Sequence, residues 1–273
     1  MGSVDFVARF RDEAARFEAA VRRAADAPEA PPVPSCPGWT VSDLVLHLGQ
    51  VHRVVTAILR TRLVDPPEGE DPEFGLPGER PGWPAPRGGP TPGPVPASLV
   101  EWYAAGAEEL GGTFAATDPA LHVWTWSPEQ TAGFWMRMQA IEAAVHRWDA
   151  EAAVGDPAPP DRMLACDAMA QTFEVMAPAR RRFRPAPPGA GETYRFRATD
   201  TGQSWSVRFS GDEVEFPAHE RGGPPTAKGL SVELSGTAAD LMMFTWGRVP
   251  LDRLAVAGDH RIAERLPVLI PPV

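Results

Sequence analysis

The chain has 273 residues, 43% of them apolar and 23% charged, which is enough for one large or two ordinary folded domains. Its net charge of −10 argues against a nucleic-acid backbone as the main partner. No apolar run approaches the roughly 18 residues of a membrane helix, and the first residues lack the apolar core of a secretion signal. Two cysteines, Cys36 and Cys166, are too few for a disulfide framework. We therefore expect a cytoplasmic protein with reduced thiols.

Helical periodicity dominates the first 180 residues. The predicted helices span residues 3–26, 40–63, 97–116, 129–152 and 160–179. The second of them has a clear start, because Thr40 is a natural N-cap and Asp43 stands in capping-box position. The stretch 64–95 is rich in proline and glycine, so we expect a long loop that covers a pocket or shapes its mouth.

Beyond about residue 184 the pattern changes to the period-two alternation of strands. The predicted strands span residues 193–199, 204–210, 213–216, 230–235 and 254–257, and short helices are expected at 237–246 and 259–266. The sequence thus predicts an α+β protein with two domains. Residues 1–180 would form a four-helix bundle with an extra helix, and residues 181–273 a small α+β domain. The basic run 180–184 is interpreted as a surface between them.

The fourth predicted helix carries a pair of residues that suggests a metal site. Glu142 and His146 are four residues apart, so their side chains lie on one face of the helix. A carboxylate and an imidazole in this arrangement are suitable ligands for zinc. A solvated helical ion pair is the ordinary alternative. However, the apolar residues Met138, Ile141 and Val145 on or beside the same stripe indicate that the pair faces the interior.

His47 is the candidate third ligand, because it lies on the apolar stripe of the second helix. A buried histidine without a metal is the commoner role for such a residue. His52 is five residues further, about 140° around the helix, and is predicted to lie at the surface. Asp43 and Asp149 are placed to orient the imidazoles, although a helix cap and an exposed charge are the simpler roles for these two residues.

Several segments together resemble a known family. Residues 36–49 begin Cys-Pro-Gly-Trp-Thr-Val-Ser-Asp and continue through His47, and residues 142–149 read Glu-Ala-Ala-Val-His-Arg-Trp-Asp. Near the end, residues 241–248 and 254–259 complete the pattern. In this order the segments resemble the mycothiol-dependent maleylpyruvate isomerase family, which belongs to the DinB-like superfamily of helical bundles.

The resemblance implies a site and a chemistry. It implies a divalent metal, zinc first, held by His47, Glu142 and His146, with mycothiol as the thiol cosubstrate. A metal-bound thiolate would add to a small electrophilic substrate, in an isomerase or an S-transferase reaction. Arg248 would be the catalytic residue that meets the carboxylates of the substrate. A structural arginine that binds carbonyl groups after Gly247 is the alternative for this position.

Two other functions stay open at this point. The same fold could support a metal-dependent hydrolase without a thiol, or a non-catalytic module that binds small molecules. In every case the expected partners are small molecules, not nucleic acids or membranes. A monomer is the default expectation. Cys36, without a histidine base nearby in the sequence, is expected to be a small packed residue.

Overall fold

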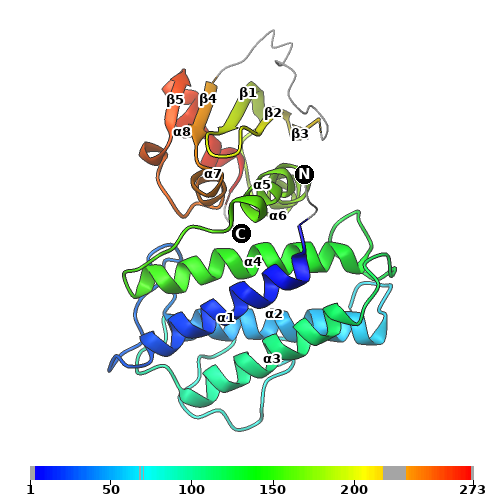
Figure 1. Ribbon diagram of the computed structural model, residues 1–273, viewed down its shortest axis with the longest axis vertical. Coiled ribbons are helices and arrows are strands. Elements are labelled where there is room, and N and C mark those ends of the chain that lie inside the picture. The colour runs from blue at the N-terminus through cyan, green and yellow to red at the C-terminus, as the bar shows by residue number, and fades with distance from the viewer. Residues whose placement is uncertain (1–3, 68, 70, 218–231, 272–273) are drawn as a thin grey trace. The chain divides into compact units, whose positions relative to one another are not determined.

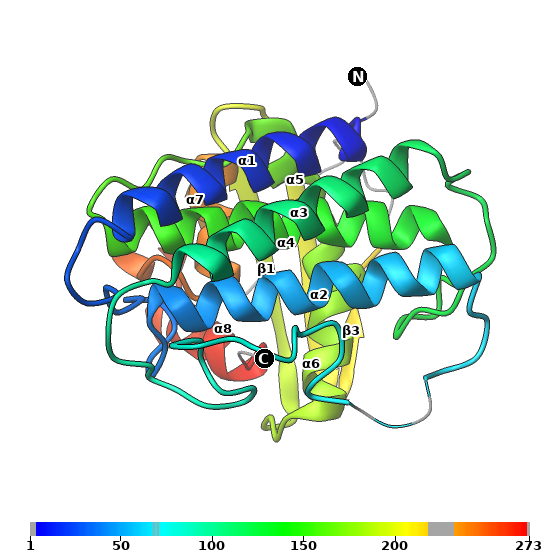
Figure 2. The same ribbon diagram turned by 90° about the horizontal axis from the view of Figure 1, so that it is seen from below.

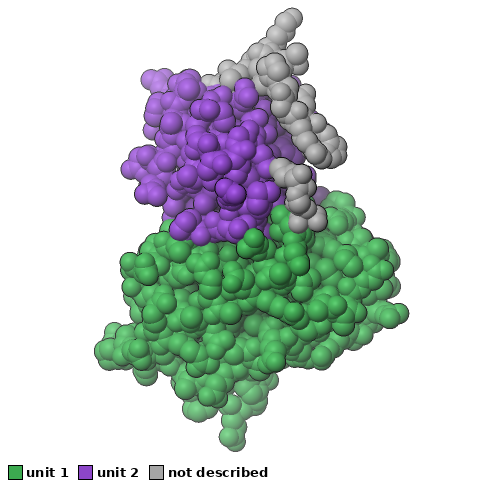
Figure 3. Space-filling view, in the orientation of Figure 1, with its two compact units in different colours: residues 1–158 green, residues 159–273 purple. Residues whose placement is uncertain are grey.

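In the computed structural model of the chain, the described residues are 4–67, 69, 71–217 and 232–271. The chain forms two compact units, residues 1–158 and residues 159–273, which are coloured separately in Figure 3. The first unit is helical and the second combines helices with a sheet, which confirms the predicted α+β class. Across the described residues, no helix is long and apolar enough to cross a membrane.

The first unit is built from long helices that pack along one another (Figures 1 and 2). These are α1 (Phe6–Ala24), α2 (Val41–Thr61), α3 (Ala97–Ala115) and α4 (Ala132–Ala153). The closest pairings are α1 with α4 and α2 with α3. Their apolar faces meet in a core that includes Phe17, Leu44, Leu48, Leu99 and Tyr103.

The predicted start of α2 is confirmed. Thr40 and Asp43 form a capping box, in which Asp43 Oδ2 accepts from the Thr40 backbone N–H at 2.8 Å. The same carboxylate also accepts from the backbone N–H of Thr91 at 3.0 Å and from its hydroxyl at 2.6 Å. Asp43 therefore fixes both the first turn of α2 and the end of the 64–95 segment, and its contacts are those of a structural cap.

The described part of the 64–95 segment is irregular, as predicted, and packs on α2 and α3. The indole of Trp102 donates to the Gly75 carbonyl at 3.1 Å, and Gln50 Nε2 donates to the Pro72 carbonyl at 2.8 Å. Trp83 packs edge-on against Trp102. Side chains of α2 and α3 therefore hold the segment against these two helices.

A buried ion network joins α1 to α4. Arg147 of α4 is fully buried, and its Nε donates to Glu13 of α1 at 2.7 Å. Its Nη1 donates to Glu151, one turn further along α4, at 2.6 Å, and also donates to the Ala158 carbonyl. Because each charged group has an opposite charge beside it, the cost of burying these ions is offset. Arg147 follows His146, so the network also fixes this turn of α4.

The second unit contains a five-stranded sheet, counted over the described residues, with the order β3-β2-β1-β4-β5. The strands are β1 (Gly189–Ala198), β2 (Ser204–Gly211), β3 (Glu213–Glu215), β4 (Val232–Gly236) and β5 (Ala255–Gly258). Only the β1–β4 pair is parallel among these, and the other neighbours are antiparallel. The predicted strands are confirmed in these positions. Residues 230 and 231 of the fourth prediction, like His219, lie outside the described residues.

The helices of the second unit are α5 (Arg162–Gln171), a π-helical turn (Thr172–Met176), α6 (Ala177–Phe183), α7 (Ala238–Thr245) and α8 (His260–Leu269). A short 3₁₀ turn, Leu251–Arg253, precedes β5. Phe173, in the π-helical turn, packs against Phe196 of β1 with ring centroids 5.1 Å apart. Thr245 at the end of α7 contacts Met169 of α5.

These contacts change the expected domain division. The sequence interpretation placed the boundary at residue 180 and assigned the 160–179 helix to the bundle. In the structure the chain divides after Ala158, and α5 belongs to the second unit. The reason is that the apolar side chains of this helical stretch pack on α7 and on the sheet. Periodicity identified the helix but not the surface that it covers.

Candidate metal centre

The structure brings His47, Glu142 and His146 together inside the first unit. His47 comes from α2, whereas Glu142 and His146 come from successive turns of α4. One potential ligand atom from each residue lies within 4.8 Å of the other two. His47 Nε2 is 3.6 Å from Glu142 Oε1, and the two imidazole rings meet edge to face with centroids 5.3 Å apart. The two residues predicted from their spacing on α4 and the residue predicted on α2 thus lie together in one cluster.

His146 is oriented by a buried carboxylate. Its Nδ1 is 2.9 Å from Oδ2 of Asp149, whose side chain is 0% exposed. Asp149 also accepts a hydrogen bond from the Ser35 hydroxyl, and the Cys36 thiol lies 3.8 Å from its Oδ2. An ionised carboxylate can only accept, so it favours the tautomer of His146 with the proton on Nδ1. Nε2 is then the nitrogen that His146 can offer to the cluster.

The second carboxylate oxygen of Glu142 is held by a hydrogen bond. Gln139, one turn earlier on α4, donates from Nε2 to Glu142 Oε2 at 2.7 Å. Burial by itself raises the pKa of Glu142, but the imidazole of His47, the charge of His146 and the Gln139 amide together bring that pKa below its usual value. The carboxylate is therefore ionised at neutral pH, which is the form that binds a metal.

The donor set fits a divalent metal such as zinc. Two imidazoles and a carboxylate are a common three-ligand set for catalytic zinc, which leaves a fourth position for water or substrate. Tetrahedral ligands at about 2.05 Å lie about 3.3 Å apart, so the 3.6 Å between His47 and Glu142 needs little adjustment. The His47 side chain is 36% exposed, whereas those of Glu142 and His146 are 15% and 11% exposed. The cluster is therefore accessible from the His47 side.

The sequence predicts only some of the groups around the cluster. Asp149 is fully buried, so its role as an exposed charge is excluded and its contact with His146 is confirmed. Gln139 and Ser35 were not singled out, although Gln139, Glu142, His146 and Asp149 follow a 3-4-3 spacing that places them on one face of a helix. That spacing was the available signal for Gln139. Ser35 had none, because it comes from a distant loop.

The prediction for His52 is wrong. This side chain is 0% exposed and packs between Phe10 and Tyr103, with ring centroids 5.2 and 5.4 Å away. Neither ring nitrogen has a hydrogen-bond partner among the described residues. Burial lowers the pKa of His52 to about 3, so it is neutral under ordinary conditions. The angular separation from His47 was right, but α2 is covered on that side too, by α1 and α3.

Arg248 lies in the second unit, directly after the Gly247 turn that ends α7. Its backbone N–H donates to the Met243 carbonyl at 2.7 Å, and its Nη1 donates to the Trp246 carbonyl at 2.7 Å. The structural role considered for this residue is therefore present. These contacts do not test its predicted catalytic role, which stays a prediction.

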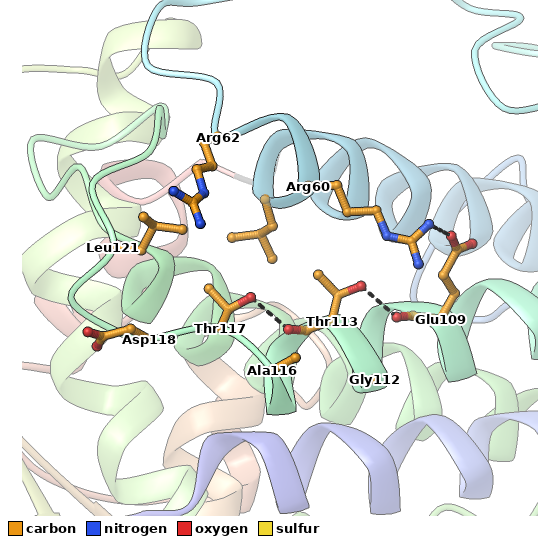
Figure 4. A pocket seen from close by; sticks show the side chains of 10 residues that line it. Arg60, Arg62, Glu109, Gly112, Thr113, Ala116, Thr117, Asp118 and Leu121 are labelled. Carbon is orange, nitrogen blue, oxygen red and sulfur yellow. Dashed lines mark hydrogen bonds and ion pairs between the residues drawn. The ribbon is translucent and has the colours of Figure 1, made fainter.

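A cavity of about 680 Å³ lies in the first unit, away from the cluster (Figure 4). It lies between the end of α2 and the second half of α3, and an ion pair between Arg60 and Glu109 crosses it. Leu59 of its wall is twelve residues beyond His47, which corresponds to about 18 Å along the helix. None of the predicted ligands lines this cavity. The cavity and the histidine–glutamate cluster are therefore separate features of the first unit.

The chain is thus a two-unit α+β protein. Its helical unit carries a His₂–Glu cluster, and its second unit contains a mixed sheet that has five strands over the described residues. Family models agree with this division. The model described as the mycothiol maleylpyruvate isomerase N-terminal domain matches residues 10–151, and the model of the C-terminal domain of the same family matches residues 163–265. The chain therefore belongs to the mycothiol maleylpyruvate isomerase family, and this membership makes it an enzyme.

Solved structures support the same fold. Two crystal structures of the mycothiol-dependent maleylpyruvate isomerase, one with a histidine changed to alanine, match with TM-scores of 0.58 and 0.60. Each covers 93% of this chain and 92% of the other, at 14% identity. Similarity at this low identity establishes the architecture. No curated protein matches the sequence.

Proposed function

We propose that the chain is a divalent-metal-dependent isomerase that uses a low-molecular-weight thiol, mycothiol, on a small unsaturated electrophile such as maleylpyruvate. The observation that carries this proposal is the convergence of His47, Glu142 and His146, with His146 anchored by a buried Asp149. Family membership supports the thiol and the substrate class. Zinc is the metal that the donor set favours.

Each residue of the cluster would have its own part in binding the metal. His47 and His146 would each offer a ring nitrogen to the metal, and Glu142 would offer a carboxylate that Gln139 holds in place. A zinc ion bound there would lower the pKa of a thiol in its open position, so that the thiol reacts near neutral pH. Thiol addition to the double bond of a maleyl group permits rotation about the resulting single bond, and elimination returns the thiol with the trans isomer.

Arg248 is proposed to hold a carboxylate of the substrate. Its planar guanidinium can form two parallel hydrogen bonds to a carboxylate. We also propose a cytoplasmic enzyme, in keeping with two free cysteines, Cys36 and Cys166. A monomer is the simplest assembly and can be checked by light scattering.

The test is an isomerisation assay on metal-loaded protein, with maleylpyruvate as substrate and with or without mycothiol. Turnover should require both the metal and the thiol, and the thiol should be recovered unchanged, because an isomerase regenerates it. Consumption of one thiol per product would instead indicate an S-transferase. Metal content measured in parallel should fall in His47→Ala and Glu142→Ala. Full metal binding by both variants would exclude this cluster as the metal site.

A further inference from the structure

Arg180 in the second unit is a buried cation that has no counter-charge beside it among the residues that the structure describes. The sequence interpretation placed the run 180–184 on a surface, but Arg180 is only 4% exposed. Its Nη1 donates to the Thr245 carbonyl at 3.3 Å, and its Nε has no hydrogen-bond partner in the described part of the chain. Within the described ranges, Arg180 forms no ion pair. Buried arginines are ordinarily paired with a carboxylate, so this one requires an explanation.

A second unsatisfied donor lies beside it. The Arg180 guanidinium stacks over the Trp246 ring, with its Cζ 4.7 Å from the ring centroid. The indole Nε1 of Trp246 is also buried without a hydrogen-bond partner among the described residues. Guanidinium and indole nitrogens can donate but cannot accept, so the two groups cannot satisfy each other. The stacked pair therefore presents two buried donors for which the described ranges supply no acceptor.

The charge at this place is positive. Burial lowers the pKa of Arg180 to about 10, and the positive charge of Arg248 acts in the same direction. Arg248 binds the carbonyl of Trp246, so both arginines lie at the same end of α7. An anion between these groups would supply the missing acceptor and also reduce the repulsion between the two cations.

A purely structural role explains only part of these observations. Cations near the C-terminus of a helix are stabilised by its dipole, and both arginines bind carbonyl groups at the end of α7. That role accounts for one guanidinium nitrogen of Arg180. Over the described residues, it leaves the Nε of Arg180 and the indole N–H of Trp246 unsatisfied. Buried donors of this kind are uncommon in folded proteins and call for a partner.

We propose that Arg180 and Trp246, together with Arg248, form a carboxylate-binding site at the end of α7. The planar guanidinium edge that contains Nε matches a planar carboxylate, and the indole N–H supplies a further donor. The inference rests on the proposed function in one respect, since the carboxylate would belong to the small-molecule substrate. Arg180 is then a binding residue that acts beside Arg248.

The experiment measures succinate binding to the full-length protein by calorimetry, after removal of metal on a chelating resin. Succinamide, which is uncharged, and inorganic phosphate serve as comparison ligands. We expect saturable binding of succinate, weaker binding of phosphate and none of succinamide. Arg180→Lys should weaken succinate binding about tenfold, because an ammonium cannot form the planar bidentate contact. Trp246→Phe, which keeps the ring but removes the N–H, should weaken binding several-fold.

Matched controls come from the same unit. Arg181→Lys changes a neighbouring arginine whose hydrogen bonds go to the carbonyls of Pro187, Gly211, Asp212 and Leu269. Trp205→Phe changes another tryptophan, in β2. Both variants should bind succinate like the original protein. If circular dichroism shows that Arg180→Lys does not fold, succinate binding by Trp246→Phe tests the proposal.

The proposal is overturned if the original protein does not bind succinate, if phosphate binds more tightly, or if both site variants bind succinate unchanged. Because the assay uses metal-free protein and no thiol, its outcome is separate from that of the proposed isomerase reaction. Loss of thiol-dependent turnover with intact succinate binding would count against the proposed function alone.

Discussion

At the scale of single residues, Asp149 supports the proposed metal site by holding His146. It is fully buried, binds His146 Nδ1 at 2.9 Å and accepts from Ser35. A carboxylate behind a ligating imidazole fixes the ring and makes the other nitrogen a stronger donor. The side chain of His146 therefore reaches the cluster already oriented by a neighbour three residues away.

Replacing Asp149 by asparagine should weaken zinc binding by about 10- to 100-fold, because an amide carries no charge and does not select one tautomer. Competition with a chromophoric chelator measures this change. Asp156→Asn, at an exposed aspartate shortly after α4, is the matched control and should leave the affinity unchanged. An Asp149→Asn protein with the original affinity would show that this carboxylate does not support the site.

His52 predicts a dependence of stability on pH. Burial lowers its pKa to about 3 in the folded chain, whereas Glu142 raises it and Arg53, His47 and His146 lower it slightly. The unfolded chain, with a histidine pKa near 6.5, therefore binds more protons than the folded chain between pH 3 and 6.5. Stability is complete above that window and falls as the pH decreases through it, by about 2 kcal/mol between pH 7 and pH 5.

Urea unfolding of the original protein and of His52→Leu at the two pH values tests this prediction. The leucine variant should lose about 2 kcal/mol less on going from pH 7 to pH 5, because it has no proton to bind at this position. Equal losses in the two proteins would mean that His52 is accessible to protons in the folded state.

At the scale of elements, α4 carries two different networks in consecutive residues. Gln139, Glu142, His146 and Asp149 are joined along one stripe. Arg147 points to another side, where it pairs with Glu13 of α1. A helix turns about 100° per residue, so neighbours in the sequence serve different partners. The ion pair between Arg147 and Glu13 thus fixes α4 against α1 at the turn that carries His146, a proposed ligand.

Removing one partner from this network should be costly. Glu13→Ala leaves the fully buried Arg147 with fewer carboxylates, and we expect a loss of about 3–5 kcal/mol in the free energy of unfolding. Chemical denaturation measures it. Glu18→Ala, also on α1 but paired with Arg22 in a more exposed setting, should cost less than about 1 kcal/mol. Similar losses in the two variants would show that the buried ion pair contributes no more to the free energy of unfolding than the exposed one.

At the scale of the whole molecule, the proposed functions of the two units can be separated. The candidate ligands all lie in residues 1–158, whereas Arg180, Trp246 and Arg248 lie in residues 159–273. A ligand that binds only the folded state stabilises the part that holds it. Metal binding should therefore act first on the helical unit and carboxylate binding on the α+β unit.

Hydrogen exchange tests this separation. Adding zinc should slow amide exchange in α2 and α4 around the ligands, because local opening must then release the metal. Amides in β1 and β2 should exchange at an unchanged rate. Glu142→Ala should abolish the effect in both helices. Protection by zinc that persists in this variant would place the metal elsewhere.

The sequence alone determined much of this protein, because local periodicity specifies which residues share a face. The spacing of Glu142 and His146, the stripe that includes His47, the cap at Thr40 and the alternating strands all follow from it. The order of the segments was also enough to indicate the family.

Only the tertiary structure decided which surface each face meets. His52 is buried because α1 and α3 cover its side of α2, and Asp149 is buried because it contacts His146 and the loop that carries Ser35. The helix at 162–171 belongs to the second unit because its partners are α7 and the sheet, and Arg180 lies inside that unit for a similar reason. Periodicity describes one element at a time. Burial depends on the elements that pack around it, which come from distant parts of the chain.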